Sequence, residues 1–336
     1  MRYYSISQIS RMGRKVDPII LEVLALSSAP DFLSPLQYHF KSGGKRMRAV
    51  LVVLSCAAAG GAPEGALRPA AVVEMIHNYS LVMDDLIDRG VIRRGKPTVR
   101  VALGNSVALL VAMFYREVLD DLIQECPAKA RIRDTAVHAM KDIIDGERLD
   151  LLFEQAGRED PYLKSNRIQK PSFHLYLEMI GKKTAALFRA AAEIGAYSAR
   201  AKPNIVNALG MFGWKSGLAF QVMDDVLDIC GSKTGKQQAK DIIEHKLGNA
   251  ATLMALEFLP AKKRAELLAI LRLDKVSRQM ASRAREMVAQ TPAELACREI
   301  AKRYLEEAKQ HLSVLEDSEY KQSLEELSER FVSRTF

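Results

Sequence analysis

The sequence predicts an all-α protein, and two observations lead to that fold class. Apolar residues recur at the helical spacing i, i+3, i+4 and i+7 through most of the chain, whereas no stretch alternates apolar and polar residues between turn signals as a strand does. The chain also has only 19 Gly and 12 Pro among its 336 residues, too few for a turn-dense β protein. We therefore expect helices throughout and no strands.

Five segments show the helical period most clearly: 51–59, 68–88, 99–114, 134–154 and 204–229. They are apolar on more than one face, as expected of helices surrounded by other helices. Residues 260–336 differ, because their apolar stripes are narrow and have many charged residues between them, which is typical of peripheral helices. The Gly- and Pro-containing breaks are short, so we expect a single domain over 1–336 with peripheral C-terminal helices at 260–336.

The charge balance argues against a nucleic-acid-binding protein. The chain has 49 Lys and Arg against 41 Asp and Glu, a net charge of +8, which is a mild excess for 336 residues. Binding to nucleic acid would need that charge on one face with interleaved aromatic residues, and no such stripe is present. We expect no nucleic-acid partner.

Cysteine usage and the apolar runs bear on the compartment. The four cysteines lie far apart without a Cys-x-x-Cys pair, so a zinc ribbon is excluded and a reduced, cytoplasmic protein is expected. No apolar run approaches the roughly 20 residues that a membrane span needs, so we expect no transmembrane segment. The basic first sixteen residues lack a sustained amphipathic pattern, and we expect an ordinary N-terminal segment there.

One acidic cluster occurs twice. VMDDLID occupies 82–88 and VMDDVLD occupies 222–228, each near the end of an apolar helical segment. On a helix the first and last Asp stand one turn apart on one face, and the carboxylates repel one another unless a multivalent cation binds. All-oxygen ligands without Cys or His favour Mg²⁺. The candidate ligands are Asp84, Asp85, Asp88, Asp224, Asp225 and Asp228. A solvated acidic helix end is the alternative, but two near-identical clusters favour the metal site.

Basic motifs flank the acidic clusters. SGGKRMR at 42–48 is a glycine-rich turn before an apolar helix, where backbone N–H groups and cations can bind phosphate. RGVIRRGKPT at 89–98 follows the first acidic cluster directly. The cations of interest are Lys45, Arg48, Arg93, Arg94, Lys183, Lys236 and Lys246. Carboxylates for Mg²⁺ with cations on both sides describe a site for diphosphate groups, and the apolar helices around it indicate a hydrophobic molecule carrying the diphosphate.

Four motifs occur in order within 43–246: GGKRMR, H-x-x-x-L-x-x-DDLID-x(4)-RRGKPT, KT and FQ-x-x-DDVLD. In these motifs the chain resembles the trans-isoprenyl diphosphate synthases, also called polyprenyl synthetases. The resemblance covers about residues 35–255. It implies a bundle of long antiparallel helices around a central apolar cavity, a homodimer, and transient contact with a membrane surface. It also implies a Mg²⁺-dependent prenyltransferase that condenses isopentenyl diphosphate with an allylic diphosphate.

The resemblance implies a role for each motif position. The six aspartates resemble two metal clusters. The residues resembling the isopentenyl diphosphate pocket are Lys45, Arg48, His77 and Arg94. Those resembling the allylic diphosphate contacts are Arg93, Lys183, Thr184, Gln221, Lys236 and Lys246, with Lys183, Thr184 and Gln221 as the catalytic residues. The chain departs from the family pattern at Glu147, which replaces a frequent Gln, and after Lys246, where Leu-Gly-Asn replaces Thr-Leu-Pro.

The residues before the first acidic cluster bear on product length. An aromatic residue five positions before it and a small one four positions before it, here Tyr79 and Ser80, resemble the pattern of short-chain enzymes that make geranylgeranyl diphosphate (C20). Helix geometry leaves the role of Tyr79 open. On an ideal helix Ser80 lies about 40° from Asp84 and Tyr79 about 140°, so Tyr79 as a core residue is the alternative.

Other functions agree less well with the motifs. A farnesyl or a longer (C25 and above) diphosphate synthase differs from the C20 enzyme only in product length. A terpene cyclase generally lacks the GGKRMR and RRG motifs and carries Asn and Ser or Thr in its second metal motif. A non-catalytic partner subunit would have degraded acidic clusters, whereas all six aspartates are present here.

Overall fold

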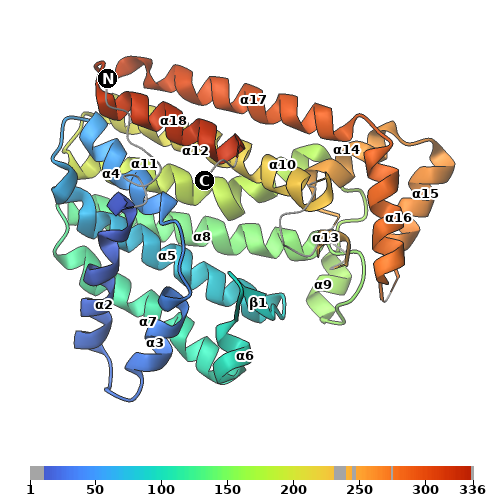
Figure 1. Ribbon diagram of the computed structural model, residues 1–336, viewed down its shortest axis with the longest axis horizontal. Coiled ribbons are helices and arrows are strands. Elements are labelled where there is room, and N and C mark those ends of the chain that lie inside the picture. Colours follow the sequence, from blue (N-terminus) through green and yellow to red (C-terminus); the bar gives the residue numbers. More distant parts are fainter. Residues whose placement is uncertain (1–10, 231–239, 244–246, 274, 334–336) are drawn as a thin grey trace.

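The computed structural model describes residues 11–230, 240–243, 247–273 and 275–333, and helices make up nearly all the regular structure in this part of the chain (Figure 1). The α-helices are α2 (Val16–Ser27), α3 (Leu33–Lys41), α4 (Met47–Ala58), α5 (Leu67–Ile87), α6 (Val99–Leu103), α7 (Asn105–Gln124), α8 (Lys129–Phe153), α9 (Pro161–Asn166), α10 (Phe173–Ile180), α11 (Ala186–Ser198), α12 (Pro203–Cys230), α13 (Lys240–Ile243), α14 (Ala250–Phe258), α15 (Ala261–Leu271), α16 (Arg278–Ala289), α17 (Ala293–His311) and α18 (Glu319–Ser333). Short helical turns are η1 (Pro63–Ala66), η2 (Gly181–Ala185) and η3 (Leu312–Val314). The all-α prediction is confirmed.

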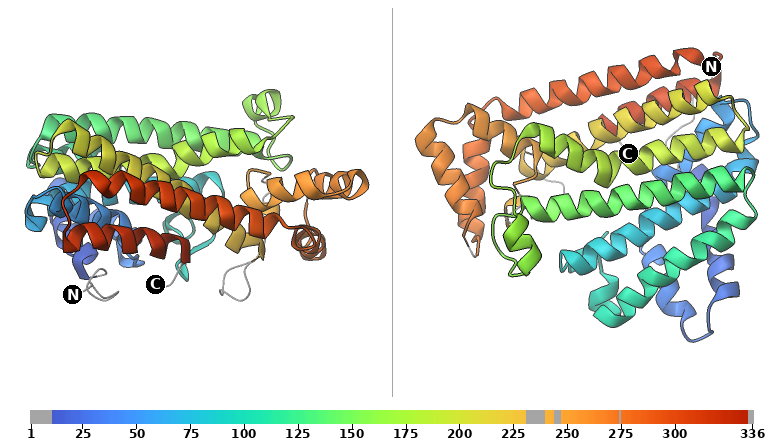
Figure 2. Two further views of the ribbon diagram at one scale, coloured as in Figure 1. Left: turned by 90° about the horizontal axis from the view of Figure 1, so that it is seen from above. Right: turned by 180° about the vertical axis from the view of Figure 1, so that it is seen from behind.

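The long helices run side by side and position the acidic clusters. Helix α11 packs against α4, α8 and α12, and α12 packs in turn against α17. Figure 1 shows α5, α8 and α12 running in the same direction, so that their carboxyl ends lie at the same end of the bundle. Helices α14, α15 and α16 gather at that end in both views of Figure 2. Because the acidic clusters are at the ends of α5 and α12, the fold brings both to one end.

Buried apolar side chains form two clusters that share α12. One lies mainly between α2, α4, α5, α7 and α11, and the other between α10, α12 and α14–α17. The first half of α12 contributes Leu209 and Phe212 to the first cluster, and its second half contributes Val222 and Val226 to the second. We propose on this basis that the chain is one domain. Two separate unfolding transitions would contradict that proposal.

Two local predictions were wrong. A two-stranded hairpin, β1 (Ile92–Arg93) and β2 (Lys96–Pro97), follows α5, although no strands were expected. Its turn residues Arg94 and Gly95 have φ angles of 53° and 75°, the positive values that a tight two-residue hairpin turn requires. The helix expected over 99–114 is divided at Gly104, whose φ of 92° separates α6 from α7.

No helix among the described residues is both long and apolar enough to cross a membrane.

Close helix contact depends on glycine at the α11–α4 crossing. A Cβ added at Gly195 of α11 would lie 2.3 Å from the carbonyl oxygen of Val52 and 2.7 Å from Cβ of Ser55, both in α4. Backbone cannot yield as a flexible side chain can, so the two helices would have to separate.

We expect the substitution Gly195→Ala to lower the free energy of unfolding by about 1–3 kcal/mol, as overpacking does in other cores. Gly65→Ala is the matched control, because nothing lies within 4 Å of a Cβ added there. Denaturant unfolding of both variants checks this. Equal stability of the two variants would show that α4 and α11 can adjust without cost.

Candidate active site

The first acidic cluster lies at the end of α5, and its middle carboxylate supports the hairpin. Arg93 donates from Nε to Oδ2 of Asp85 and from Nη2 to Oδ1, both at 2.9 Å. Asp85 is buried, whereas Asp84 and Asp88 on the same turn are only half-buried. The structure therefore brings Asp85 to Arg93 and leaves Asp84 and Asp88 on the more accessible side of α5.

An arginine that the sequence did not single out also reaches this cluster. Arg158, in the loop between α8 and α9, lies with Nη2 3.5 Å from Oδ1 of Asp88 and Nε 2.6 Å from Oε2 of Glu154. No motif carries Arg158, and it lies far from Asp88 in the sequence. Only the folded chain shows that they are neighbours.

Lys183 lies between two carboxylates of α8. Its Nζ is 2.5 Å from Oε2 of Glu147 and 2.7 Å from Oδ2 of Asp150. The helix carrying Lys183 runs from α10 to α11 and widens into a π-helical turn at η2. Gly146 permits this approach, because a Cβ there would lie 2.2 Å from the backbone nitrogen of Lys183.

Burial raises the pKa of Glu147 to about 7, because the charged carboxylate is poorly solvated there. Lys183 opposes the shift, and the negative charges of Asp84, Asp150 and Asp88 add to it. These charges act on Glu147 only because the end of α5 lies near α8. Glu147 is thus an electrostatic link between the first acidic cluster and Lys183.

The second acidic cluster, on α12, has a hydrogen-bonded middle carboxylate too. Asp225 is buried and accepts hydrogen bonds from the hydroxyl of Tyr176 at 2.7 Å, from Nε2 of Gln221 at 2.8 Å, and from the backbone N–H of Ala250 at 3.0 Å. Asn249 also donates from Nδ2 to the backbone oxygen of Asp225 at 3.2 Å. Asp224 and Asp228 are half-buried.

The π-helical turn joins the carboxylates of α8 to the second acidic cluster. Thr184, next to Lys183, donates from Oγ1 to Oε1 of Gln221 at 2.8 Å, and Gln221 in turn donates to Asp225. A continuous series of polar contacts therefore runs from α8 through Lys183, Thr184 and Gln221 to α12. Sequence reasoning missed Tyr176 and Asn249 in this network; for Asn249 the signal was its place in the Leu-Gly-Asn departure after Lys246.

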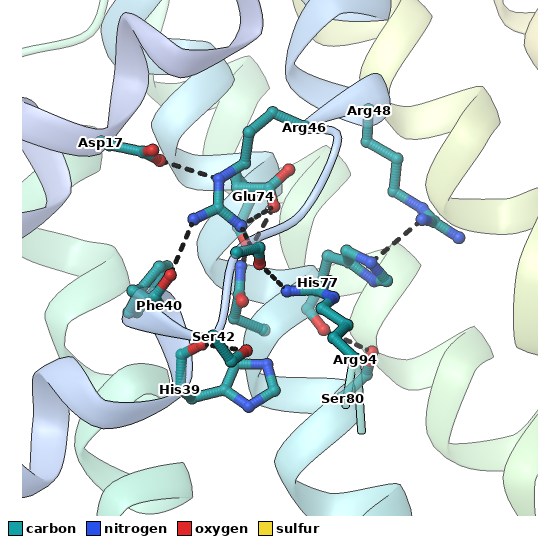
Figure 3. Close-up of polar contacts among 12 residues, drawn as sticks. Asp17, His39, Phe40, Ser42, Arg46, Arg48, Glu74, His77, Ser80 and Arg94 are labelled. Atoms are coloured by element: carbon teal, nitrogen blue, oxygen red, sulfur yellow. Dashed lines mark hydrogen bonds and ion pairs between the residues drawn. The ribbon is translucent and has the colours of Figure 1, made fainter. Parts of the chain in front are cut away.

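The basic loop 42–48 lies beside α5 and the hairpin (Figure 3). Arg48 Nη1 is 3.2 Å from Nε2 of His77, and its guanidinium lies 4.8 Å from the centre of the Phe188 ring. Arg94 donates to the backbone oxygen of Gly43. Burial and then the charges of Arg48 and Arg94 hold the pKa of His77 well below its usual value, so the imidazole is neutral at pH 7.

The remaining predicted residues differ in what the structure shows. Lys45 is exposed on the basic loop. Ser80 donates from Oγ to the backbone oxygen of His77 at 2.9 Å, and Tyr79 is half-buried against the first apolar cluster. Lys236 and Lys246 lie outside the described residues.

The acidic clusters offer carboxylate oxygens only, which is the donor chemistry of hard divalent cations. Among the residues that the structure describes, no three His, Cys, Asp or Glu side chains are grouped so as to hold a metal ion by themselves. A cation that keeps bound waters and shares ligands with a phosphate fits such a site better than one that needs a complete protein cage.

Fold and site together define a class: an all-α protein with carboxylates and cations gathered at one end of a helix bundle. The polyprenyl synthetase family model matches residues 29–288. The chain belongs to the polyprenyl synthetase family.

Relatives and solved structures agree over nearly the whole chain. A short chain isoprenyl diphosphate synthase from Methanothermobacter thermautotrophicus is 31% identical, with 99% of this chain and 97% of that one covered. The crystal structure of a geranylgeranyl pyrophosphate synthetase from Pyrococcus horikoshii is similar with a TM-score of 0.87 at 29% identity, covering 98% of each chain. A Caulobacter crescentus polyprenyl synthase complexed with calcium and isoprenyl diphosphate also gives a TM-score of 0.87 at 29% identity, covering 99% of each chain.

We expect Glu147→Gln to change how stability depends on pH. The pKa of Glu147 is raised from 4.5 to about 7 in the folded protein, so the folded state binds this proton more tightly than the unfolded state. The stabilisation is complete below about pH 4.5 and is lost as the pH rises through 7. Between pH 5 and 8 the free energy of unfolding of the unsubstituted protein should therefore fall by about 1–3 kcal/mol relative to the variant.

Urea unfolding of metal-free protein across this pH range makes the measurement. Glu178→Gln is the matched control, because its side chain is 43% exposed on α10. A difference between unsubstituted protein and Glu147→Gln that does not vary with pH would contradict the raised pKa.

Proposed function

We propose that the protein is a trans-prenyltransferase that condenses isopentenyl diphosphate with an allylic diphosphate to give geranylgeranyl diphosphate. The observation that carries the proposal is the series of contacts from Glu147 through Lys183, Thr184 and Gln221 to Asp225. It connects the carboxylates of α8, which lie within electrostatic reach of the first acidic cluster, to the second acidic cluster through a cation and hydrogen-bonding groups. Membership of the polyprenyl synthetase family and the similarity to a geranylgeranyl pyrophosphate synthetase support the same chemistry.

The proposed metal is Mg²⁺, held by Asp84 and Asp88 on α5 and by Asp224 and Asp228 on α12. The middle residues Asp85 and Asp225 are the more deeply buried ones, and their hydrogen bonds to Arg93, Gln221 and Tyr176 would let them support the metal ligands from within the protein. Substrate oxygens and waters would complete the coordination. When bound, the metal supplies positive charge that stabilises a departing diphosphate.

The allylic diphosphate is assigned to the residues between the clusters. Lys183 would supply a point charge, Gln221 would donate its second amide hydrogen to a diphosphate oxygen, and Thr184 would orient Gln221 through the hydrogen bond that it donates. Arg93 is oriented in advance by Asp85, so little freedom is lost when it meets an anion. A fixed set of cations and dipoles around the leaving group lowers the barrier to ionisation. Lys236 and Lys246 are proposed for the same diphosphate from the sequence pattern.

The diphosphate of isopentenyl diphosphate is assigned to Lys45, Arg48, His77 and Arg94. Burial lowers the pKa of Arg48 to about 10, which leaves it charged at neutral pH. His77 would act as a neutral hydrogen-bonding group, since its pKa is held well below the usual value. Two separate diphosphate sites allow the double bond of one substrate to meet the cation formed from the other, shielded from water by apolar helices.

We propose that the enzyme is a homodimer. Helix α7 exposes Leu109, Leu110 and Met113, large apolar side chains that a second copy of the chain could cover. A monomer mass in analytical ultracentrifugation would contradict the homodimer.

We also propose that the enzyme is cytoplasmic, because its four cysteines are free. Recovery of the protein from an oxidising compartment would contradict this location.

We expect labelled isopentenyl diphosphate, incubated with C5, C10 or C15 allylic primers and Mg²⁺, to be incorporated into a C20 product. Asp84→Asn or Asp224→Asn should reduce turnover at least about 100-fold. Asp142→Asn is the matched control, because Asp142 is exposed on α8. Chromatography of the products also separates C15 and C25 outcomes. No product with any primer would contradict the proposed activity, and activity that a chelator leaves intact would contradict the metal role.

We expect Tyr79→Ala to lengthen the product beyond C20, because it removes the bulk that would stop the growing chain. Chain-length analysis at fixed substrate ratios makes the measurement. Tyr162→Ala, at an exposed position of α9, should leave the product unchanged. A C20 product from Tyr79→Ala would make Tyr79 a packing residue.

A further inference from the structure

Arg46 is a buried arginine at the centre of the basic loop, and none of the proposed substrate contacts uses it. Its side chain is 2% exposed. Nε donates to Oδ1 of Asp17 in α2 at 2.8 Å, and Nη1 donates to Oε1 of Glu74 in α5 at 3.2 Å. Figure 3 shows the guanidinium between these two carboxylates and the backbone of Phe40. One side chain therefore ties the loop to two helices.

The same guanidinium also binds the loop backbone. Nη2 lies 3.4 Å from the carbonyl oxygen of Phe40, and Nη1 lies 3.4 Å from that of Gly43. Arg94, on the hairpin turn, donates to the same Gly43 oxygen. Two arginines thus share one carbonyl group, and the loop and hairpin are fixed relative to each other at that atom.

Gly44 shows how closely both arginines approach the loop. A Cβ added at Gly44 would lie 2.8 Å from Nη1 of Arg46 and 2.9 Å from Nη1 of Arg94. The φ angles of Gly43, Gly44 and Arg46 are 91°, 144° and 51°. A positive φ is unfavourable for a residue other than glycine and persists where its surroundings hold it. Arg46 keeps this conformation because its side chain has the four acceptors to bind.

Glu74 is the partner that makes the ion pair with Arg46 hard to replace. It is 1% exposed, and burial raises its pKa, with Arg46 the largest opposing influence. A buried carboxylate without its cation is costly, so the pair is maintained as a unit. The turn of α5 that carries Glu74 also carries His77 and Asn78, and Nδ2 of Asn78 donates to Oε1 of Glu74 at 3.2 Å.

We propose that Arg46 is a positioning residue for the isopentenyl diphosphate pocket, a role that rests on the function proposed above. Its nitrogens are engaged by Asp17, Glu74 and two carbonyl groups, so it acts through the loop and not on the substrate. By fixing the backbone from Phe40 to Arg46 it holds the part of the loop that carries Lys45 and, through the Gly43 oxygen, holds that loop against Arg94.

The substitution Arg46→Lys tests this, because an ammonium keeps the charge but cannot span the acceptors that the guanidinium binds. We expect the KM for isopentenyl diphosphate to rise about tenfold, while the KM for the allylic primer stays within about twofold. Arg14→Lys is the matched control, since Arg14 is exposed and precedes α2. A general loss of structure would move both KM values together.

Hydrogen exchange of the backbone amides of residues 42–48 gives a readout that does not need activity. Without substrate, these amides should exchange faster in Arg46→Lys than in the unsubstituted protein, and at an unchanged rate in Arg14→Lys. If the unsubstituted protein made no product with any primer, the proposed function would fail, whereas the exchange measurement would still decide whether Arg46 holds the loop.

The double variant Arg46→Met, Glu74→Gln removes both buried charges together, so that Asp17, whose side chain is 32% exposed and can be solvated, is the one carboxylate that loses its arginine. We expect it to fold, as judged by circular dichroism, and to show the same selective rise in the KM for isopentenyl diphosphate. An unchanged KM for this substrate in Arg46→Lys, or an equal rise for both substrates, would overturn the proposal, as would unchanged exchange of the loop.

Discussion

The site depends on the ion pairs of Lys183 with Glu147 and Asp150. These pairs hold the π-helical turn against α8 and fix the neighbouring Thr184 where it reaches Gln221 on α12. One cation facing two carboxylates leaves the local charge negative. The same excess of negative charge acts on Asp84 and Asp88. A divalent metal ion is attracted to such a group of carboxylates and can bridge them to a phosphate, which the neighbouring cations also attract.

Within each acidic cluster the middle carboxylate and the outer carboxylates differ in their burial. The middle carboxylates, Asp85 and Asp225, are buried and hydrogen-bonded by Arg93 and by Tyr176 and Gln221. Burying a charge is tolerated only with such partners. The outer carboxylates are therefore presented from helix ends whose orientation is already fixed, and a ligand need not order them.

The sequence predicted the all-α class and the acidic and basic motifs, because helical period and charge clusters are local features. It did not predict the hairpin, since two-residue strands have no period to detect. Nor did it identify Arg158, Tyr176 or Arg46, whose partners Asp88, Asp225 and Glu74 lie far along the chain. Asp85 and Asp225 looked equivalent to their neighbours until the fold showed that these two are the buried ones and that Arg93 and Tyr176 hydrogen-bond them.

The π-helical turn at Gly181–Ala185 places Lys183 and Thr184 toward different partners within one continuous helix. In evolutionary terms, such a turn is what one residue inserted into an ordinary α-helix leaves behind. Deleting one residue there would restore the regular helix, but Lys183 and Thr184 could then no longer both keep their places opposite Asp150 and Gln221. Substitutions can accumulate on this helix, but the number of residues within the turn is constrained by these two contacts.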